Sequence, residues 1–253
     1  MPSQEEIKYY NEVINQDRNK IDLVLVTYYR YPLTKKCLDF IFERTHTPYR
    51  LTIVDNGSDI QMIEYLIELK LNSRIDNLIL LDRNYGLEYA RNTALRHIHS
   101  SYCVFFDNDL LCPDLKPDWL TQELNLIQKY PEYGCIALRP QIAVGADNSK
   151  FNTDKEIVEN NHVGATFMMF KTSLLSEVKW DDTFTNRVAD WRLGDLFKEK
   201  GIKMGWTRDI YCYHMFGKNW SYPDNIQHFH REIWPPAEHY DQIKVDPLTL
   251  KPL

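Results

Sequence analysis

Two carboxylates separated by one residue, Asp107 and Asp109, follow the apolar run Val104–Phe106. A short apolar run of this kind is typical of a buried strand, and ligands of open α/β sheets bind at the carboxyl ends of strands. Two neighbouring carboxylates repel each other unless a cation lies beside them. The expected cation is Mn²⁺ or Mg²⁺, which would bridge to phosphate oxygens of a nucleotide. The plainer interpretation is a solvated turn, since Asp and Asn are common turn residues.

The elements that position this pair alternate in type along the first half of the chain. Alternating strands and helices indicate βαβ units and a mostly parallel sheet with helices on both faces. Strands are predicted at 21–27, 49–55, 78–81 and 102–106, and helices at 33–43, 59–71 and 87–97. The second half predicts a helix at 118–129, strands at 134–138 and 163–170, a polar loop at 145–161, and a helix at 193–200 that ends at Gly201.

Polar groups follow the other predicted strands as well. Thr27 ends the first strand and Asp55 ends the second, so both fall at the same sheet edge as Asp107. A carboxylate there accepts hydrogen bonds from a base or a ribose, although Asp55 is also a good turn or cap residue. Gly86 permits a tight turn before the third helix, whose Arg91 is a bidentate phosphate donor.

Composition narrows the class of protein. The 253 residues are 43% hydrophobic and 26% charged, as in an ordinary globular protein. We expect no transmembrane segment, because no apolar run approaches about 20 residues, and no secretory signal, because the N-terminus is polar. The five scattered cysteines indicate reduced thiols in a cytoplasmic protein. A formal charge of −6 argues against nucleic-acid binding. The sequence contains neither GxGxxG nor GxxxxGK[ST], which argues against nicotinamide, flavin and P-loop nucleotide sites.

Five separate motifs together carry a resemblance. Residues 20–120 hold, in order, Thr27, Asp55-Asn-Gly-Ser, Asn84-x-Gly86, Ala90-Arg-Asn92 and Asp107-Asn-Asp109. This series resembles family 2 glycosyltransferases, which have the GT-A fold, a Rossmann-like α/β architecture. In the second half, Gly164–Phe170 resembles the family's acceptor-side strand, and Asp190-Trp-Arg-Leu…Gly201 resembles its Glu-Asp-x-Asp-Leu…Gly helix. The chain departs from the latter at Ala189, in place of Glu, and at Arg192, in place of the second Asp.

The resemblance implies an inverting, metal-dependent transfer of a sugar, from a UDP-sugar or another nucleotide diphosphate, to a glycan or other hydroxyl acceptor. Asp190 would be the catalytic base, Gly164 and Trp191 would contact the acceptor, and Asp107, Asp109 and His214 would bind Mn²⁺ or Mg²⁺. The nucleotide sugar would be bound by Thr27, Tyr29, Arg30, Asp55, Asn84, Gly86, Arg91, Asp107 and Asn108. We expect a role in surface polysaccharide assembly and a cytoplasmic location, at most peripheral to the inner membrane face.

The expected organisation is one GT-A domain over residues 1–219, with the nucleotide half at 20–110 and the acceptor half at 111–219. Residues 220–253, which are aromatic and Pro-rich, predict an arm around the domain or a connector to further domains. The chain could also form a homo-oligomer.

Alternatives remain open at this stage. Asp190 could simply cap its helix, which would make Asp195 the next candidate base, and His214 could be structural. A non-catalytic nucleotide-sugar or glycan-binding module is the second hypothesis. A sugar nucleotidyltransferase is the third, although it normally needs a Gly-rich loop where this chain has Tyr28–Pro32.

Overall fold

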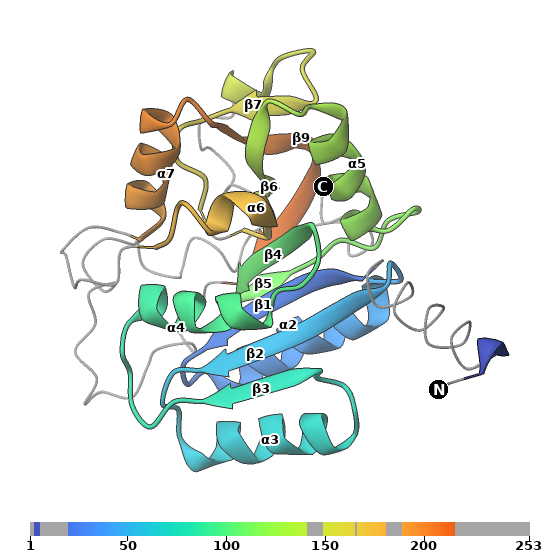
Figure 1. The fold of residues 1–253 in the computed structure, drawn as a ribbon, viewed down its shortest axis with the longest axis vertical. Helices are drawn as coiled ribbons and strands as arrows, with labels where there is room; N and C mark the ends of the chain where they lie inside the picture. Colours follow the sequence, from blue (N-terminus) through green and yellow to red (C-terminus); the bar gives the residue numbers. More distant parts are fainter. Residues whose placement is uncertain (1–2, 6–19, 141–148, 165, 181–188, 216–253) are drawn as a thin grey trace.

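The structure is a computed structural model that describes residues 3–5, 20–140, 149–164, 166–180 and 189–215. In this part of the chain, nine strands form one sheet in the order β3-β2-β1-β4-β8-β6-β9-β5, and β7 pairs with β9 (Figure 1). The predicted α/β class is confirmed, and the predicted arm at 220–253 lies outside the described residues.

The first half of the sheet is parallel and positions the predicted nucleotide edge. Its strands are β1 (Ile21–Thr27), β2 (Tyr49–Asp55), β3 (Asn77–Leu80) and β4 (Tyr102–Asp107). Its helices are α2 (Tyr31–Arg44), α3 (Ile60–Leu71) and α4 (Leu87–Ala94), the last followed by a 3₁₀ turn at Leu95–His97. Thr27 is in register with Asp55, and Val26 is in register with Asp107. The last residues of these three strands therefore lie side by side, as predicted from the sequence.

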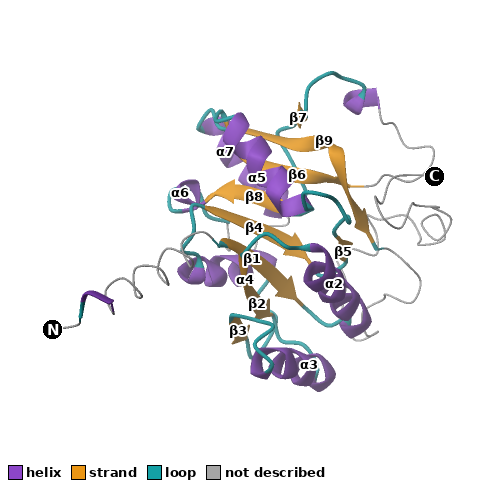
Figure 2. Cartoon of the chain, turned by 90° about the vertical axis from the view of Figure 1, so that its right-hand side faces the viewer, coloured by secondary structure: helices purple, strands orange, loops and turns teal. Residues whose placement is uncertain are grey.

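The sheet is covered on both faces because successive strand residues point to opposite sides. In β1, Leu23 and Leu25 belong to the core that includes residues of α2, α3 and α5 (Trp119–Lys129). Val24 and Val26 belong to the second core, with residues of α4 and α7 (Ala189–Glu199). Figure 2 shows α2 and α4 on opposite sides of the strands. Buried strands of this kind read as continuous apolar runs, which is the pattern of 21–27.

The second half of the sheet is mainly antiparallel. β8 (Met168–Lys171) pairs antiparallel with both β4 and β6 (Tyr133–Pro140). β9 (Lys203–His214) runs parallel to β6 but antiparallel to β5 (Leu110–Leu111) and β7 (Ile157–Glu159). A short helix, α6 (Thr172–Leu175), follows β8, and a 3₁₀ turn occupies Ser149–Phe151. The parallel pairing of the predicted, mostly parallel sheet is thus concentrated in the half that carries Asp55 and Asp107.

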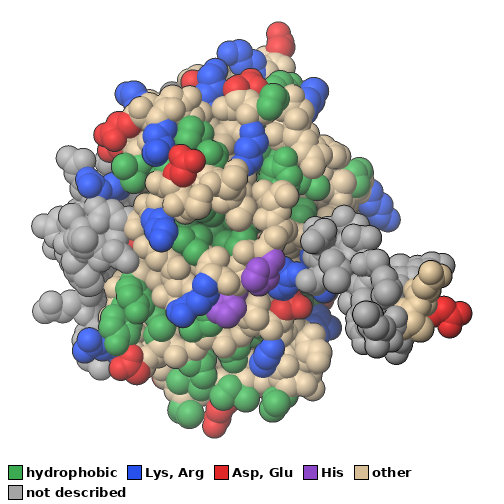
Figure 3. Space-filling model, in the orientation of Figure 1, with side chains coloured by type: hydrophobic (Ala, Val, Ile, Leu, Met, Phe, Trp, Pro, Cys, Tyr) green, Lys and Arg blue, Asp and Glu red, His purple; other side chains and the backbone are tan. Residues whose placement is uncertain are grey.

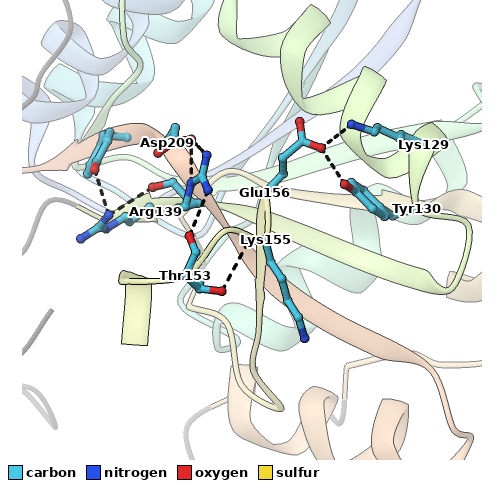
Figure 4. A network of polar contacts seen from close by, with 9 residues as sticks. Lys129, Tyr130, Arg139, Thr153, Lys155, Glu156 and Asp209 are labelled. Carbon is cyan, nitrogen blue, oxygen red and sulfur yellow. Dashed lines mark hydrogen bonds and ion pairs between the residues drawn. The ribbon is translucent and has the colours of Figure 1, made fainter. Parts of the chain in front are cut away.

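Residues 149–161, the described part of the polar stretch predicted as a loop at 145–161, contain a strand. Ile157 and Val158 are buried, which explains why they form β7 on the edge of β9. The hydroxyl of Tyr130 donates to Glu156 at 2.6 Å, and the Arg139 guanidinium donates to the Tyr211 hydroxyl at 2.8 Å. Figure 4 shows Tyr130 and Lys129 meeting Glu156 beside the stretch. Two buried apolar residues within a polar run were too weak a sequence signal to predict a strand.

The cysteines, the described helices and the surface charges can be compared with what the composition predicts. All five cysteines are buried and free of disulfides. None of the described helices combines the length and the apolar character needed to cross a bilayer. On the face drawn in Figure 3, basic and acidic side chains are interspersed.

Candidate active site

Asp55 links the ends of β1 and β2. Its carboxylate is fully buried and accepts hydrogen bonds from the Thr27 hydroxyl at 2.9 Å, the Ser58 amide at 2.9 Å and the Ser58 hydroxyl at 2.5 Å. Thr27 and Asp55 therefore meet as predicted. Because these donors already use much of the capacity of the carboxylate, its visible role is to close the turn after β2. Contact with the nucleobase stays a prediction.

The turn between β1 and α2 has an unusual backbone. Tyr29 and Arg30 both have positive φ angles, 51° and 58°, a conformation that residues other than glycine rarely adopt. The Tyr29 amide donates to the Ser58 hydroxyl at 2.7 Å, and the Arg30 carbonyl accepts from the Leu33 and Thr34 amides. The turn is thus tied to the Asp55 cluster on one side and to the first turn of α2 on the other.

Asp109 receives two basic side chains. Arg30 Nη1 lies 2.7 Å from Asp109 Oδ2, and His214 Nε2 lies 3.0 Å from Asp109 Oδ1. Burial alone would raise the pKa of Asp109, but His214 and Arg30 outweigh this effect and lower the pKa to about 2. His214 reaches this position because β9 pairs with β5, where His214 is in register with Leu110. Asp109 and His214, both predicted as metal ligands, thus lie within hydrogen-bond distance of each other, and their binding of a metal stays a prediction.

Asp107 is the more accessible carboxylate of the pair. Its side chain is 35% exposed, against 8% for Asp109. Arg91 Nη2 lies 3.1 Å from Asp107 Oδ1, and the Arg91 guanidinium also lies over the Trp180 ring at 5.6 Å. With its side chain only 1% exposed, Arg91 holds Asp107 from inside the protein and leaves the carboxylate open to solvent.

The other predicted nucleotide residues form the turns beside these carboxylates. Asn84 Oδ1 accepts from the Asn56 side chain at 2.9 Å and from the Gly86 amide at 2.8 Å. Gly86 has a φ of 95° at the start of α4, which explains its glycine. Asn108 is buried and donates to the Thr34 hydroxyl at 2.9 Å. Its side chain points toward α2, and its contact with a nucleotide stays a prediction.

Sequence reasoning did not single out Asn56 and Ser58 as functional residues. Asn56 accepts from the Tyr85 amide at 3.0 Å and so joins the β2 turn to the turn before α4. The available signals were their position directly after Asp55 and their place in the Asp55-Asn-Gly-Ser motif, in a segment that reads equally well as an ordinary Asn-Gly turn.

The acceptor side is described only in part. Gly164 precedes β8, and its carbonyl accepts from the Thr166 amide at 2.6 Å. Asp190 and Trp191 belong to the first turn of α7, but their side chains lie outside the described part of the structure. Asp195, farther along the same helix, has its carboxylate 3.2 Å from His162 Nε2. The roles assigned to Asp190, Trp191 and Gly164 remain predictions.

Asp109 and His214 are placed to supply two of the ligands of a divalent metal. Two ligands bound at right angles about 2.1 Å from an ion lie about 3.0 Å apart, and Asp109 Oδ1 and His214 Nε2 are 3.0 Å apart. Among the described residues, no three His, Cys, Asp or Glu side chains are gathered closely enough to hold a metal. The donor set therefore suits an ion that takes its other ligands from water and phosphate oxygens, as Mg²⁺ commonly does.

Comparisons with solved structures find the same fold. The chain aligns with the mannosyltransferase PcManGT of Pyrobaculum calidifontis, solved with GDP-Man and Mn²⁺, over 84% of this chain and 65% of that one, with a TM-score of 0.65 at 19% identity. It also aligns with residues 1–349 of S. aureus TarS, over 78% of this chain and 60% of that one, with a TM-score of 0.59 at 16% identity. At these identities the likeness establishes the fold.

Comparisons of sequence identify relatives and a family. The chain is 31% identical over 131 residues to the glycosyltransferase GlyA of Streptococcus pneumoniae, a match that covers 50% of this chain and 16% of GlyA. It is 30% identical over 92 residues to a teichoic acid poly(glycerol phosphate) polymerase of Staphylococcus epidermidis, covering 36% of this chain and 13% of the polymerase. The matched stretches are thus less than a fifth of either relative. The sequence model of glycosyl transferase family 2 matches residues 22–194, and the chain belongs to that family.

Proposed function

We propose that this chain is an inverting, metal-dependent glycosyltransferase that transfers a sugar from a UDP-sugar, or another nucleotide diphosphate, to a hydroxyl acceptor. The observation that carries the proposal is the edge formed by β1, β2 and β4. There Asp107 is open to solvent beside the buried Asp109, next to the Thr27–Asp55 pair. Membership of glycosyl transferase family 2 supports it, as do similar structures solved with GDP-Man and Mn²⁺ or with UDP-GlcNAc.

On the donor side, we assign the nucleotide to residues 20–110. Asp109 and His214 would hold Mn²⁺ or Mg²⁺ on one side, with Asp107 facing the nucleotide. A divalent ion bound there neutralises the charge that develops on the leaving diphosphate. Arg91 fixes the orientation of Asp107 through their 3.1 Å contact, and its burial excludes water from that side of the pair.

On the acceptor side, we assign the hydroxyl substrate to residues 111–219, with Asp190 as the base. Leu193 and Phe197 of α7 belong to the same core cluster as Ala90 and Ala94 of α4, so α7 covers the face of the sheet from which Arg91 approaches Asp107. A base at the start of α7 would take the proton from the acceptor hydroxyl as its oxygen attacks the anomeric carbon. A single displacement of this kind inverts the anomeric configuration.

One relative supports a proposal for the acceptor class. One of them is a teichoic acid polymerase, which favours a hydroxyl on a bacterial surface polymer. Because the match covers only 13% of that protein, this assignment is part of the proposal.

The test is release of nucleoside diphosphate from UDP-sugars and GDP-mannose, with and without Mn²⁺ and a surface-polymer acceptor. We expect release to require Mn²⁺ and to be lost in Asp107→Asn and Asp109→Asn. Asp39→Asn, an exposed residue paired with Lys35 on α2, is the matched control and should behave as the wild type. Full activity in excess EDTA, or a product with the donor's anomeric configuration, would refute the proposal. Binding of nucleotide sugar without any release would favour a non-catalytic module.

A further inference from the structure

We propose that Arg30 is an exchangeable counter-ion of the metal site. In the free protein its guanidinium neutralises one oxygen of the Asp109 carboxylate, whose other oxygen faces His214 and would hold a divalent cation. The guanidinium transfers to the nucleotide diphosphate when the cation binds. This inference rests on the proposed function and concerns how the same site couples its two ligands.

The contacts of Asp109 place the guanidinium and a bound cation on opposite oxygens of the same carboxylate. Arg30 Nη1 lies 2.7 Å from one carboxylate oxygen, while His214 Nε2 lies 3.0 Å from the other. A divalent ion bound between Asp109 and His214 would share this carboxylate with a second positive charge only a few ångströms away. Because like charges at that distance repel strongly in a buried site, the guanidinium must leave as the ion enters.

The charges of the site favour joint binding of the metal and the diphosphate over binding of the metal alone. Asp107 is paired with Arg91 and Asp109 with Arg30, so these two carboxylates are already balanced by two guanidinium groups. A divalent ion by itself adds uncompensated positive charge, whereas an ion with a diphosphate does not. A guanidinium displaced from Asp109 has a natural new partner in the diphosphate, since Arg binds phosphate in a bidentate manner.

The backbone allows the side chain to move while the turn stays fixed. Tyr29 and Arg30 are both held at positive φ. The Tyr29 amide is anchored on Ser58, which in turn donates to Asp55. The Arg30 carbonyl accepts from the first turn of α2. The Arg30 side chain is nevertheless 19% exposed, against 8% for Asp109. A strained turn fixed by neighbouring polar groups therefore presents a long side chain on the solvent side of the carboxylate, a feature that clusters at functional sites.

The test measures Mn²⁺ binding by electron paramagnetic resonance, with and without UDP, in the full chain. Arg30→Asn is the informative variant, because asparagine tolerates positive φ and is too short to reach Asp109. We expect Mn²⁺ alone to bind the variant about tenfold more tightly than the wild type, in the usual range of coupling between sites. UDP should bind the variant more weakly in the presence of Mn²⁺, so that UDP strengthens Mn²⁺ binding less than it does in the wild type.

Two further variants make the result specific. Arg30→Lys keeps the positive charge and should leave Mn²⁺ binding near the wild-type value. Lys35→Gln removes an exposed charge on α2 that pairs with Asp39 and should change neither ligand. If Mn²⁺ binds Arg30→Asn no more tightly than the wild type, or if UDP affinity is unchanged, the exchange is refuted while Mn²⁺-dependent transfer by the wild type still stands. If the wild type binds neither Mn²⁺ nor UDP, the proposed function fails as well.

Discussion

The side chain of Glu123 provides a quantitative test of the packing behind the site. Glu123 lies on α5, fully buried, and neither of its carboxyl oxygens has a hydrogen-bond partner. A negative charge on Glu123 would raise the pKa of Cys212, which lies two residues before His214 on β9. Burial raises the pKa of Glu123 well above its usual value, so the native protein keeps this carboxyl protonated under conditions where the unfolded chain ionises it.

The sign of the pH dependence follows from the proton count. Above the ordinary pKa of Glu, about 4.3, the unfolded chain loses a proton that the native protein retains. The free energy of unfolding must then fall as pH rises, by about 1.4 kcal/mol per pH unit for one proton. The contribution is present in full at low pH and is lost progressively on the alkaline side.

The perturbation is Glu123→Gln, which keeps the size of the side chain but cannot ionise. The stability of the variant relative to the wild type should increase with pH above the ordinary pKa of Glu, by at most about 1.4 kcal/mol per unit. Urea unfolding at several pH values measures it, with Glu64→Gln on the exposed side of α3 as the control. Parallel pH profiles for Glu123→Gln and the wild type would refute the reasoning, because they would mean that Glu123 ionises in the native protein.

Three further predictions concern the site. Asp55→Asn replaces an acceptor of three hydrogen bonds and should weaken UDP binding by about 1.5–3 kcal/mol. An unchanged calorimetric affinity for every nucleoside diphosphate would contradict the base contact. Asp190→Asn should lower kcat by on the order of 10²–10⁴ with donor affinity retained, and near-normal turnover would shift the role to Asp195. Gly194→Ala would place a methyl group 2.0 Å from the Asn161 carbonyl oxygen. The clash should displace α7 and reduce acceptor turnover more than UDP binding. Equal losses in turnover and in UDP binding would contradict the assignment of α7 to the acceptor side.

The sequence predicted the sheet edge well because few alternatives satisfy parallel topology. Once 21–27, 49–55 and 102–106 are strands joined through helices, their carboxyl ends must meet. Thr27, Asp55 and Asp107 therefore had to be neighbours, and their register confirms it. The order of the motifs along the chain then pointed to the family.

The details around the edge depended on geometry that periodicity does not encode. No glycine or asparagine signals the positive φ of Tyr29 and Arg30, so the reach of Arg30 to Asp109 was not foreseeable. The inward hydrogen bond of Asn108 to Thr34 depends on how α2 packs against the turn after β4. The proximity of His214 and Asp109 needs the β5–β9 pairing, which brings together segments far apart in sequence; only the resemblance indicated it.

The different environments of Asp107 and Asp109 follow from where β4 ends. Residues two apart on a strand share a face, but β4 ends at Asp107, and the chain turns before β5 begins at Leu110. Asp107 is therefore held by Arg91 from α4, whereas Asp109 is held by Arg30 from the β1–α2 turn and by His214 from β9. The parallel half of the sheet alone cannot supply His214. Under the proposed assignment, a cation held by Asp109 and His214 requires both halves to be folded together, so metal binding would report on the assembly of the whole sheet.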